Sequence, residues 1–209
     1  MCGRFYLDAD TEFLLNYYHI KYEPKVKTEQ HIFYPTQAAP VIIEVGGDRR
    51  LGTMQWGFGG KTPLFNSRAE TIHSKVTFKD AFEKRRCIIP ATGFYEWSEK
   101  TDSKKDPKKK DRYKIEMPNQ EIMHMAGIYT KTTDDSGQLK WQFTVVTREA
   151  NADMGIIHHR MPLMLSVSDI STWMDSQTPL SDLKELLNFD IGHLNVILDE
   201  PQIHIDTLL

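Results

Sequence analysis

The stretch Arg86-Cys-Ile-Ile-Pro-Ala-Thr-Gly-Phe-Tyr-Glu-Trp97 holds two short runs of apolar and aromatic residues, interrupted by a proline. Runs of this kind favour strands, so the stretch predicts one strand on each side of the break. Because side chains alternate along a strand, Phe94 and Glu96 share one face, and Tyr95 and Trp97 share the other. A carboxylate among aromatic rings is suited to general acid–base work, although Glu96 could also be solvated at a sheet edge.

Outward from this stretch, the chain alternates strands with scattered short helices. Further strands are predicted at residues 2–7, 40–45, 51–56, 113–117, 121–130, 139–147 and 194–198. Asp10 or Thr11 caps a helix running to about Ile20, and shorter helices are predicted at 77–84 and after Ser168 and Ser181. This order predicts a single α+β domain over residues 1–209, with an antiparallel, partly closed, barrel-like sheet and short flanking helices.

The composition is that of an ordinary soluble globular protein. Of 209 residues, 40% are hydrophobic and 26% charged, and no apolar run approaches the length of a membrane span. The net charge of -3 argues against a wholly electrostatic nucleic-acid binder but allows a local basic groove. Six lysines fall in residues 98–112, where charges of both signs mix, which predicts a solvated surface loop.

The cysteines and histidines predict neither a disulfide framework nor a metal site. Cys2 and Cys87 are isolated, so we expect a reducing, intracellular compartment and a buried, inert Cys87. The adjacent His158 and His159 make a poor metal pair, because neighbouring residues rarely point at one ion and no nearby Cys or carboxylate completes a set. The start of the chain shows no basic region, apolar core or small-residue cleavage site, so we expect no signal peptide.

The first residues, Met1-Cys-Gly-Arg-Phe5, offer a distinctive chemistry if Met1 is removed. Cys2 would then carry a free amine and a thiol two atoms apart, with unperturbed pKa values of roughly 8 and 8.5. Such a 1,2-aminothiol condenses with an aldehyde to an imine, which the thiol closes to a thiazolidine ring. The alternative is an ordinary thiol near a frayed terminus, and this stretch alone favours that alternative.

Two further polar stretches stand out. In the first, residues 66–71, the Asn66 side chain offers a hydrogen-bond donor and an acceptor, and the planar guanidinium of Arg68 is suited to binding a phosphate. Alternatively, Asn66 is a turn residue and Arg68 an ordinary surface residue. In the second, His158-His159-Arg160, one histidine could shuttle protons near neutral pH.

Together these motifs resemble the SRAP proteins (SOS response-associated peptidase fold), which process abasic sites. The resemblance rests on residues 1–5, 66–71, 86–97, 126–127, 147–151 and 158–162, in the family's order. It implies an SRAP fold, recognition of abasic sites in single-stranded DNA, and a thiazolidine DNA–protein cross-link on Cys2. It also implies autoproteolytic release of Met1 and an abasic-site lyase side activity.

Roles for individual residues follow from the same resemblance. Asn66 matches the residue that positions the N-terminal amine, Glu96 the acid–base group, and His158 the residue that opens the sugar ring. DNA contacts are expected from the following residues: Arg4, Arg68 and Arg160, with Trp56, Phe58 and Trp97 as candidate stacking surfaces. We expect no cofactor and no metal, a monomer, no membrane association, and a cytoplasmic, DNA-associated location.

Two other functions use the same residues. In the first, Cys2 is the nucleophile of a peptidase or amidase acting in trans, with His158 as base and Asn66 in an oxyanion hole. In the second, the chain is a non-covalent single-strand DNA-binding module. The resemblance also has departures: Gly57-Phe-Gly-Gly60 replaces an apolar, Pro-containing loop, Ser67 replaces a small apolar residue, and the chain after Val167 matches poorly.

Overall fold

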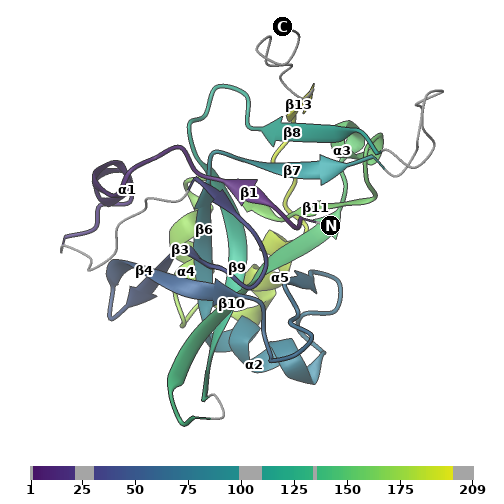
Figure 1. The fold of residues 1–209 in the computed structure, drawn as a ribbon. Coiled ribbons are helices and arrows are strands. Elements are labelled where there is room, and N and C mark those ends of the chain that lie inside the picture. The colour runs from purple at the N-terminus through teal and green to yellow at the C-terminus, as the bar shows by residue number, and fades with distance from the viewer. Residues whose placement is uncertain (1, 22–30, 99–109, 134–135, 200–209) are drawn as a thin grey trace, which may run out of the picture.

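The computed structural model describes residues 2–21, 31–98, 110–133 and 136–199, and its fold is the mixed α+β fold that the sequence predicted (Figure 1). The strands are β1 Phe5–Tyr6, β2 Ile32–Phe33, β3 Ala38–Val45, β4 Asp48–Trp56, β5 Asn66–Arg68, β6 Arg86–Ala91, β7 Gly93–Trp97, β8 Arg112–Glu116, β9 Met123–Thr133, β10 Leu139–Glu149, β11 Arg160–Pro162, β12 Met164–Leu165 and β13 Asn195–Leu198. The helices are α1 Thr11–Tyr17, α2 Val76–Lys84, α3 Ala152–Gly155, α4 Asp169–Met174 and α5 Leu180–Leu187.

Five strands close into a barrel. The order β10-β4-β3-β6-β9 is completed by a long antiparallel pairing of β9 with β10, from Leu139↔Thr133 to Val145↔Gly127. The contact between β10 and β4 is parallel, whereas β3–β4, β3–β6 and β6–β9 are antiparallel. The expectation of an antiparallel, partly closed sheet is therefore confirmed, with one parallel seam that lets β10 close the ring.

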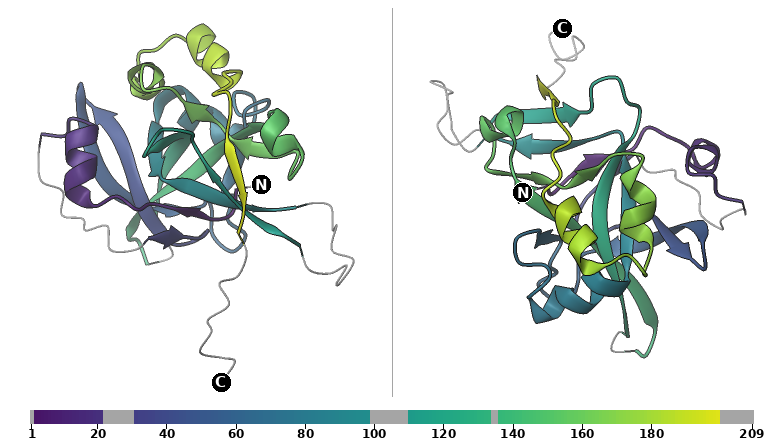
Figure 2. Two further views of the ribbon diagram at one scale, coloured as in Figure 1. Left: turned by 90° about the horizontal axis from the view of Figure 1, so that it is seen from above. Right: turned by 180° about the vertical axis from the view of Figure 1, so that it is seen from behind.

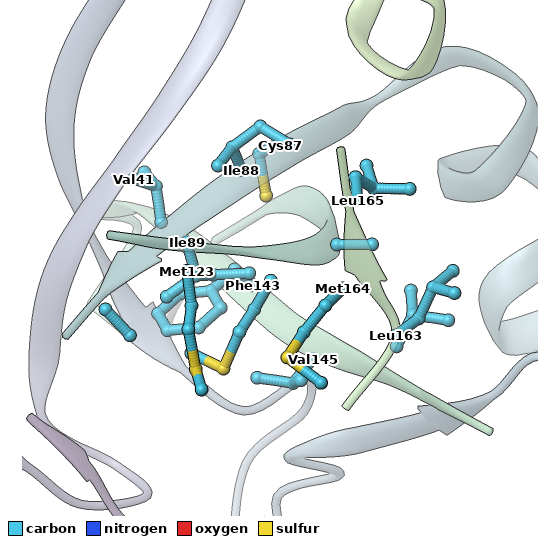
Figure 3. Close-up of a cluster of buried hydrophobic side chains, with 14 of the residues drawn as sticks. Val41, Cys87, Ile88, Ile89, Met123, Phe143, Val145, Leu163, Met164 and Leu165 are labelled. Carbon is cyan, nitrogen blue, oxygen red and sulfur yellow. The ribbon is translucent and has the colours of Figure 1, made fainter. Parts of the chain in front are cut away.

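The barrel is filled by apolar side chains from every wall. Figure 3 shows residues of β3, β6, β9 and β10 converging with those of the segment 163–165. The fully buried members labelled there include Val41, Ile89, Phe143 and Val145, each with no exposed surface. Burying side chains of this size contributes about 1.5–3 kcal/mol each, which makes the barrel a rigid support for the strands attached to it.

A second sheet of five strands, in the order β13-β8-β7-β1-β2, lies beside the barrel. Its central strand is β7, and β1 lies between β7 and the edge strand β2, pairing antiparallel with β7 through Phe5↔Phe94 and Tyr6↔Gly93. The Tyr95 amide also donates to the Arg4 carbonyl at 2.9 Å, so the pairing continues toward the chain start. The strand predicted at 2–7 is regular only at its centre.

Short elements surround the two sheets. Figure 2 shows α4 and α5 together on one side of the barrel, and α4 packs against β6. The Asp10 side chain accepts a hydrogen bond from the Phe13 amide at 2.7 Å and caps α1, as predicted. Helix α5 begins at Leu180, after Pro179, so it does not follow from the predicted cap at Ser181.

The Lys-rich loop predicted at 98–112 lies largely outside the described residues, because the structure describes none of residues 99–109. At its end, Arg112 is already the first residue of β8 and pairs with Trp97 of β7. Arg112 also binds the carboxylate of Asp199 at 2.6 Å. The loop therefore connects two paired strands, which is a hairpin arrangement.

Gly93 of β7 lies in close contact with both neighbouring strands, β1 and β8. A Cβ atom there would lie 2.5 Å from the Ile115 carbonyl oxygen and 2.5 Å from the Tyr6 hydroxyl. We predict that Gly93→Ala destabilises the fold by about 1–3 kcal/mol in urea unfolding, because a backbone atom of β8 cannot yield. Gly52→Ala is the control, since nothing lies within 4 Å of its Cβ position in β4. Equal unfolding midpoints for the two variants would contradict this prediction.

Candidate active site

Three segments that are distant in the sequence meet at the start of the chain. Asn66 of β5 donates from Nδ2 to the Cys2 carbonyl at 3.0 Å. Glu96 of β7 lies near enough for its charge to act on the Cys2 thiol. Both Cys2, with no exposed surface, and Glu96, 5% exposed, are buried. The three residues that the sequence singled out here are therefore brought together.

The Cys2 thiol is held in its protonated form. Burial, and then the charge of Glu96, raise the pKa of this thiol to about 12. At neutral pH very little thiolate exists, so a nucleophilic Cys2 requires a base close by to take its proton. The nearby Glu96 carboxylate is such a group, and its Oε1 also accepts a hydrogen bond from the Trp97 amide at 3.2 Å.

Asn66 is positioned by a parallel pairing, because Val145 of β10 is its partner in the ladder. Its Nδ2 is used by Cys2, and its buried Oδ1 accepts no hydrogen bond from any described residue. A buried acceptor without a donor is costly and rare in native proteins. The orientation of Asn66 thus leaves an acceptor beside the residue that would carry an N-terminal amine.

The strand β1, which leads from Cys2 into the fold, is anchored at its other end by a polar cluster. The Tyr6 hydroxyl donates to Glu116 Oε1, and Lys114 Nζ lies 2.8 Å from the same oxygen. Although burial opposes it, the hydrogen bonds from Lys114 and Tyr6 lower the pKa of the Glu116 carboxyl. This cluster joins β1 to β8 and restrains the strand that presents Cys2.

His158 lies in the turn between α3 and β11. Its backbone amide donates to the Met154 carbonyl at 2.9 Å, and its ring stacks on His159 with the centroids 4.5 Å apart. The Arg160 amide donates to His158 Nδ1 at 2.9 Å. Because Nδ1 accepts, the neutral ring must carry its proton on Nε2, and Nε2–H is the donor that this histidine offers.

The segments that carry Arg68 and His158 are joined through the end of β10. Thr147 of β10 pairs with Arg68 of β5 on one side and with Pro162 of β11 on the other. A depression of about 480 Å³ lies there, lined by Arg68, Glu149, Ala150, Gly155, His159 and Arg160. Within this depression Arg68 is exposed, as a residue that binds a phosphate must be.

Arg4 stands on the outer face of the second sheet, among aromatic rings. Its guanidinium carbon lies 4.6 Å from the ring centroid of Tyr34 and 4.8 Å from that of Trp97, which places the cation between two rings. Tyr95 is a third neighbour, at 6.0 Å. Tyr95 and Trp97 share this face, as the alternation predicted, whereas Tyr34 follows β2 in a stretch that gave no signal in the sequence.

Three side chains that the sequence assigned to DNA contacts are buried in this structure. Trp56 has no exposed surface and Phe58 is 4% exposed, so neither ring offers a face for a nucleobase. The Trp56 Nε1–H instead donates to the Phe65 carbonyl at 2.8 Å within the barrel. Arg160 is also buried, and its guanidinium donates to both carboxylate oxygens of Glu70, at 2.7 and 3.0 Å.

Comparison with known proteins identifies the family. A family model described as SOS response associated peptidase (SRAP) matches residues 1–196. The chain belongs to this family. Among its relatives, "Abasic site processing protein YoqW" of Bacillus subtilis (strain 168) is 31% identical over 201 residues, covering 90% of this chain and 86% of YoqW.

More distant relatives of this SRAP chain carry a similar description. "Abasic site processing protein HMCES" of Xenopus tropicalis is 25% identical over 204 residues, which cover 80% of this chain and 59% of HMCES. A crystal structure of a protein from Bacteroides thetaiotaomicron has a TM-score of 0.81 at 24% identity, covering 99% of this chain and 94% of the other. This second likeness shows the fold alone.

The described ranges contain neither a cluster of metal ligands nor a membrane-spanning helix. No three His, Cys, Asp or Glu side chains gather there as metal ligands. None of the helices in those ranges is long and apolar enough to cross a bilayer.

Thiol labelling tests the burial of Cys2. We predict that both cysteines of the folded chain that retains Met1 react with iodoacetamide at pH 8 at least about 100-fold more slowly than in urea. The reason is that burial raises the pKa of both thiols, so little thiolate is present at that pH. Peptide mapping by mass spectrometry assigns the labelled residue, and Cys87 serves as the internal reference. Rapid labelling of Cys2 in the folded chain would contradict the prediction.

Proposed function

We propose that this SRAP protein recognises abasic sites in single-stranded DNA and traps them covalently on Cys2 once Met1 has been removed. The observation that carries the proposal is the group around Cys2: a buried thiol, an Asn66 side chain bonded to the Cys2 carbonyl, and the neighbouring Glu96. Relatives described as abasic site processing proteins support the same substrate.

The first step in the proposed mechanism opens the sugar. An abasic deoxyribose is mostly a closed hemiacetal, so its ring oxygen must gain a proton before the aldehyde at C1′ is released. His158 supports this step, because the hydrogen bond at its Nδ1 leaves Nε2–H to donate to the ring oxygen. As the bond between C1′ and the ring oxygen breaks, the ring oxygen takes the Nε2 proton and Nε2 takes the proton of the anomeric hydroxyl in the same step, so the ring stays neutral.

The second step joins protein and DNA. The Cys2 amine adds to C1′, and the carbinolamine loses water to give an imine. Asn66 Oδ1 is a buried acceptor suited to orient the amine, and Glu96 takes protons from the ammonium and later from the thiol. The sulfur then adds to the imine carbon and the nitrogen gains a proton, which closes the thiazolidine. The net change is the sum of the two molecules minus one water.

Binding of the DNA strand in this proposal uses two cationic side chains, those of Arg68 and Arg4. Arg68 is exposed in the depression at the end of β10, and Arg4 lies between the rings of Tyr34 and Trp97. Phosphate contacts with little base readout tolerate any flanking sequence. The same active site is proposed to release Met1: with Glu96 as base, the Cys2 thiol adds to the Met1 carbonyl and displaces the Cys2 nitrogen, and water then hydrolyses the thioester to free Met1.

Intact-mass measurement tests the proposal directly. We expect the mature protein, mixed with single-stranded DNA bearing one abasic site, to gain the mass of the DNA minus water. Cys2→Ser should give no product that survives heat, and acetylating the N-terminal amine should abolish the product. The failure of the mature protein to form any covalent product would sink the proposal. Reversible binding that acetylation does not affect would instead support a non-covalent DNA-binding module, and multiple-turnover peptide hydrolysis a peptidase.

A Cys2→Ala variant tests the competition between thiol capture and strand cleavage. Its N-terminal amine can still form the imine, but no sulfur closes the ring. Loss of a C2′ proton then expels the 3′ phosphate, so we expect strand nicking at the abasic site to increase. Borohydride trapping and gel analysis of labelled DNA measure the imine and the nick. Heat-stable cross-linking by Cys2→Ala would contradict this mechanism.

A further inference from the structure

The pair formed by Glu70 and Arg160 connects strands that approach the site from two sides. Arg160 begins β11, its side chain is 7% exposed, and it donates to Glu70 Oε1 at 2.7 Å and Oε2 at 3.0 Å. The same guanidinium donates to the Thr147 carbonyl of β10 at 2.6 Å. A bidentate ion pair of this kind fixes the relative orientation of the two side chains as well as pairing their charges. Glu70 lies two residues after the end of β5, so the pair links the segment after β5 to β10 and β11.

The backbone of Arg160 also determines how His158 is oriented. Its amide is the group that donates to His158 Nδ1, at 2.9 Å. The flanking hydrogen bonds, from the His158 amide to Met154 and from the Ala150 amide to the His159 carbonyl, hold the turn on both sides. The backbone position of Arg160 therefore contributes to fixing the His158 ring, whose Nδ1 accepts this hydrogen bond.

We propose that Glu70 is a positioning residue for His158, acting through Arg160. The inference rests on the proposed function, in which the Nε2–H of His158 opens the sugar ring. If Glu70 loses its charge, a buried guanidinium is left without its anionic partner, and such a group moves toward water. The start of β11 moves with it, and the hydrogen bond that fixes the His158 ring is lost.

Glu70 suits this role because its contacts favour a permanent charge. Although partial burial opposes it, the hydrogen bonds from Arg160 lower the pKa of the Glu70 carboxyl. Its side chain is 45% exposed, so replacing it with glutamine leaves no cavity in the core. Asp80 on α2 is a matched control, because it binds Arg85 at 2.6 Å through a similar ion pair remote from the site.

Two DNA aldehydes separate positioning from a general structural effect. Glu70→Gln should cross-link a natural, ring-closed abasic site about 10- to 100-fold more slowly than the unaltered protein, because a displaced acid loses its alignment. A strand with an internal open-chain aldehyde needs no ring opening, so its rate should stay within about twofold. Asp80→Asn should change neither rate. Equal losses on both aldehydes, or no loss on the ring-closed site, would overturn the proposal.

Affinity for DNA is measured separately with a tetrahydrofuran analogue, which cannot react. The proposal expects the same affinity for Glu70→Gln and the unaltered protein. A loss of affinity that matches the loss of rate would mean that Arg160 holds a phosphate, and would overturn the positioning role. Arg160→Lys is the second variant, because lysine keeps the positive charge but cannot form the bidentate pair with Glu70. It should show the same selective loss of cross-linking rate on the ring-closed site.

Nitrogen-15 NMR of the histidine ring gives a readout that does not depend on cross-linking. In the unaltered protein we expect His158 in its Nε2–H form, and in Glu70→Gln a mixture of both neutral forms. If the unaltered protein cross-links neither aldehyde, the proposed function fails, and the NMR spectra alone decide the positioning of His158. An unchanged tautomer in Glu70→Gln would overturn the inference in either case.

Discussion

The antiparallel pairing of β1 with β7 is the interaction on which the candidate site depends. Phe5↔Phe94 and the hydrogen bond from the Tyr95 amide to the Arg4 carbonyl fix the start of the chain against the strand that carries Glu96. A chain terminus is ordinarily among the least ordered parts of a protein. Here the pairing of β1 with β7 on one side and β2 on the other makes the start of the chain a buried structural element, which a reaction at Cys2 requires.

The second support is β10, the strand with the most neighbours. It closes the barrel against β9 and β4, and its far end pairs with β5 and β11. Asn66 and Arg160 therefore stand on strands registered to the same backbone. Because the barrel is packed with apolar side chains, its strands cannot shift independently of one another. The polar groups at the ends of these strands are therefore held rigidly as well. Distances of 3 Å between groups 60 or more residues apart are maintained in this way.

The sequence predicted much of this and failed for identifiable reasons. Alternation along 93–97 placed Phe94 and Glu96 on one face, because a period of two is a local property of the strand, but only the structure shows that this face is the buried one. The parallel pairing of β5 with β10 has no local signature, so composition alone read Asn66 as a turn residue. We assigned Trp56, Phe58 and Arg160 to DNA contacts from their residue types. The type of a residue does not show whether its side chain points to solvent or into the core. The partner that turns Arg160 inward, Glu70, lies 90 positions away.

The protonation states around Cys2 fit one another. At neutral pH the buried Cys2 thiol keeps its proton with the Glu96 side chain beside it, and the hydrogen bond at His158 Nδ1 puts the proton of a neutral ring on Nε2. In the proposed reaction Glu96 is the acceptor for the thiol proton, and His158 Nε2–H is the donor to the sugar. No group must change its charge before the sugar arrives, which avoids the cost of creating an ion in a buried site. A thiol exposed as thiolate would attack faster, but it would also oxidise; a buried thiol that reacts only after imine formation avoids that loss.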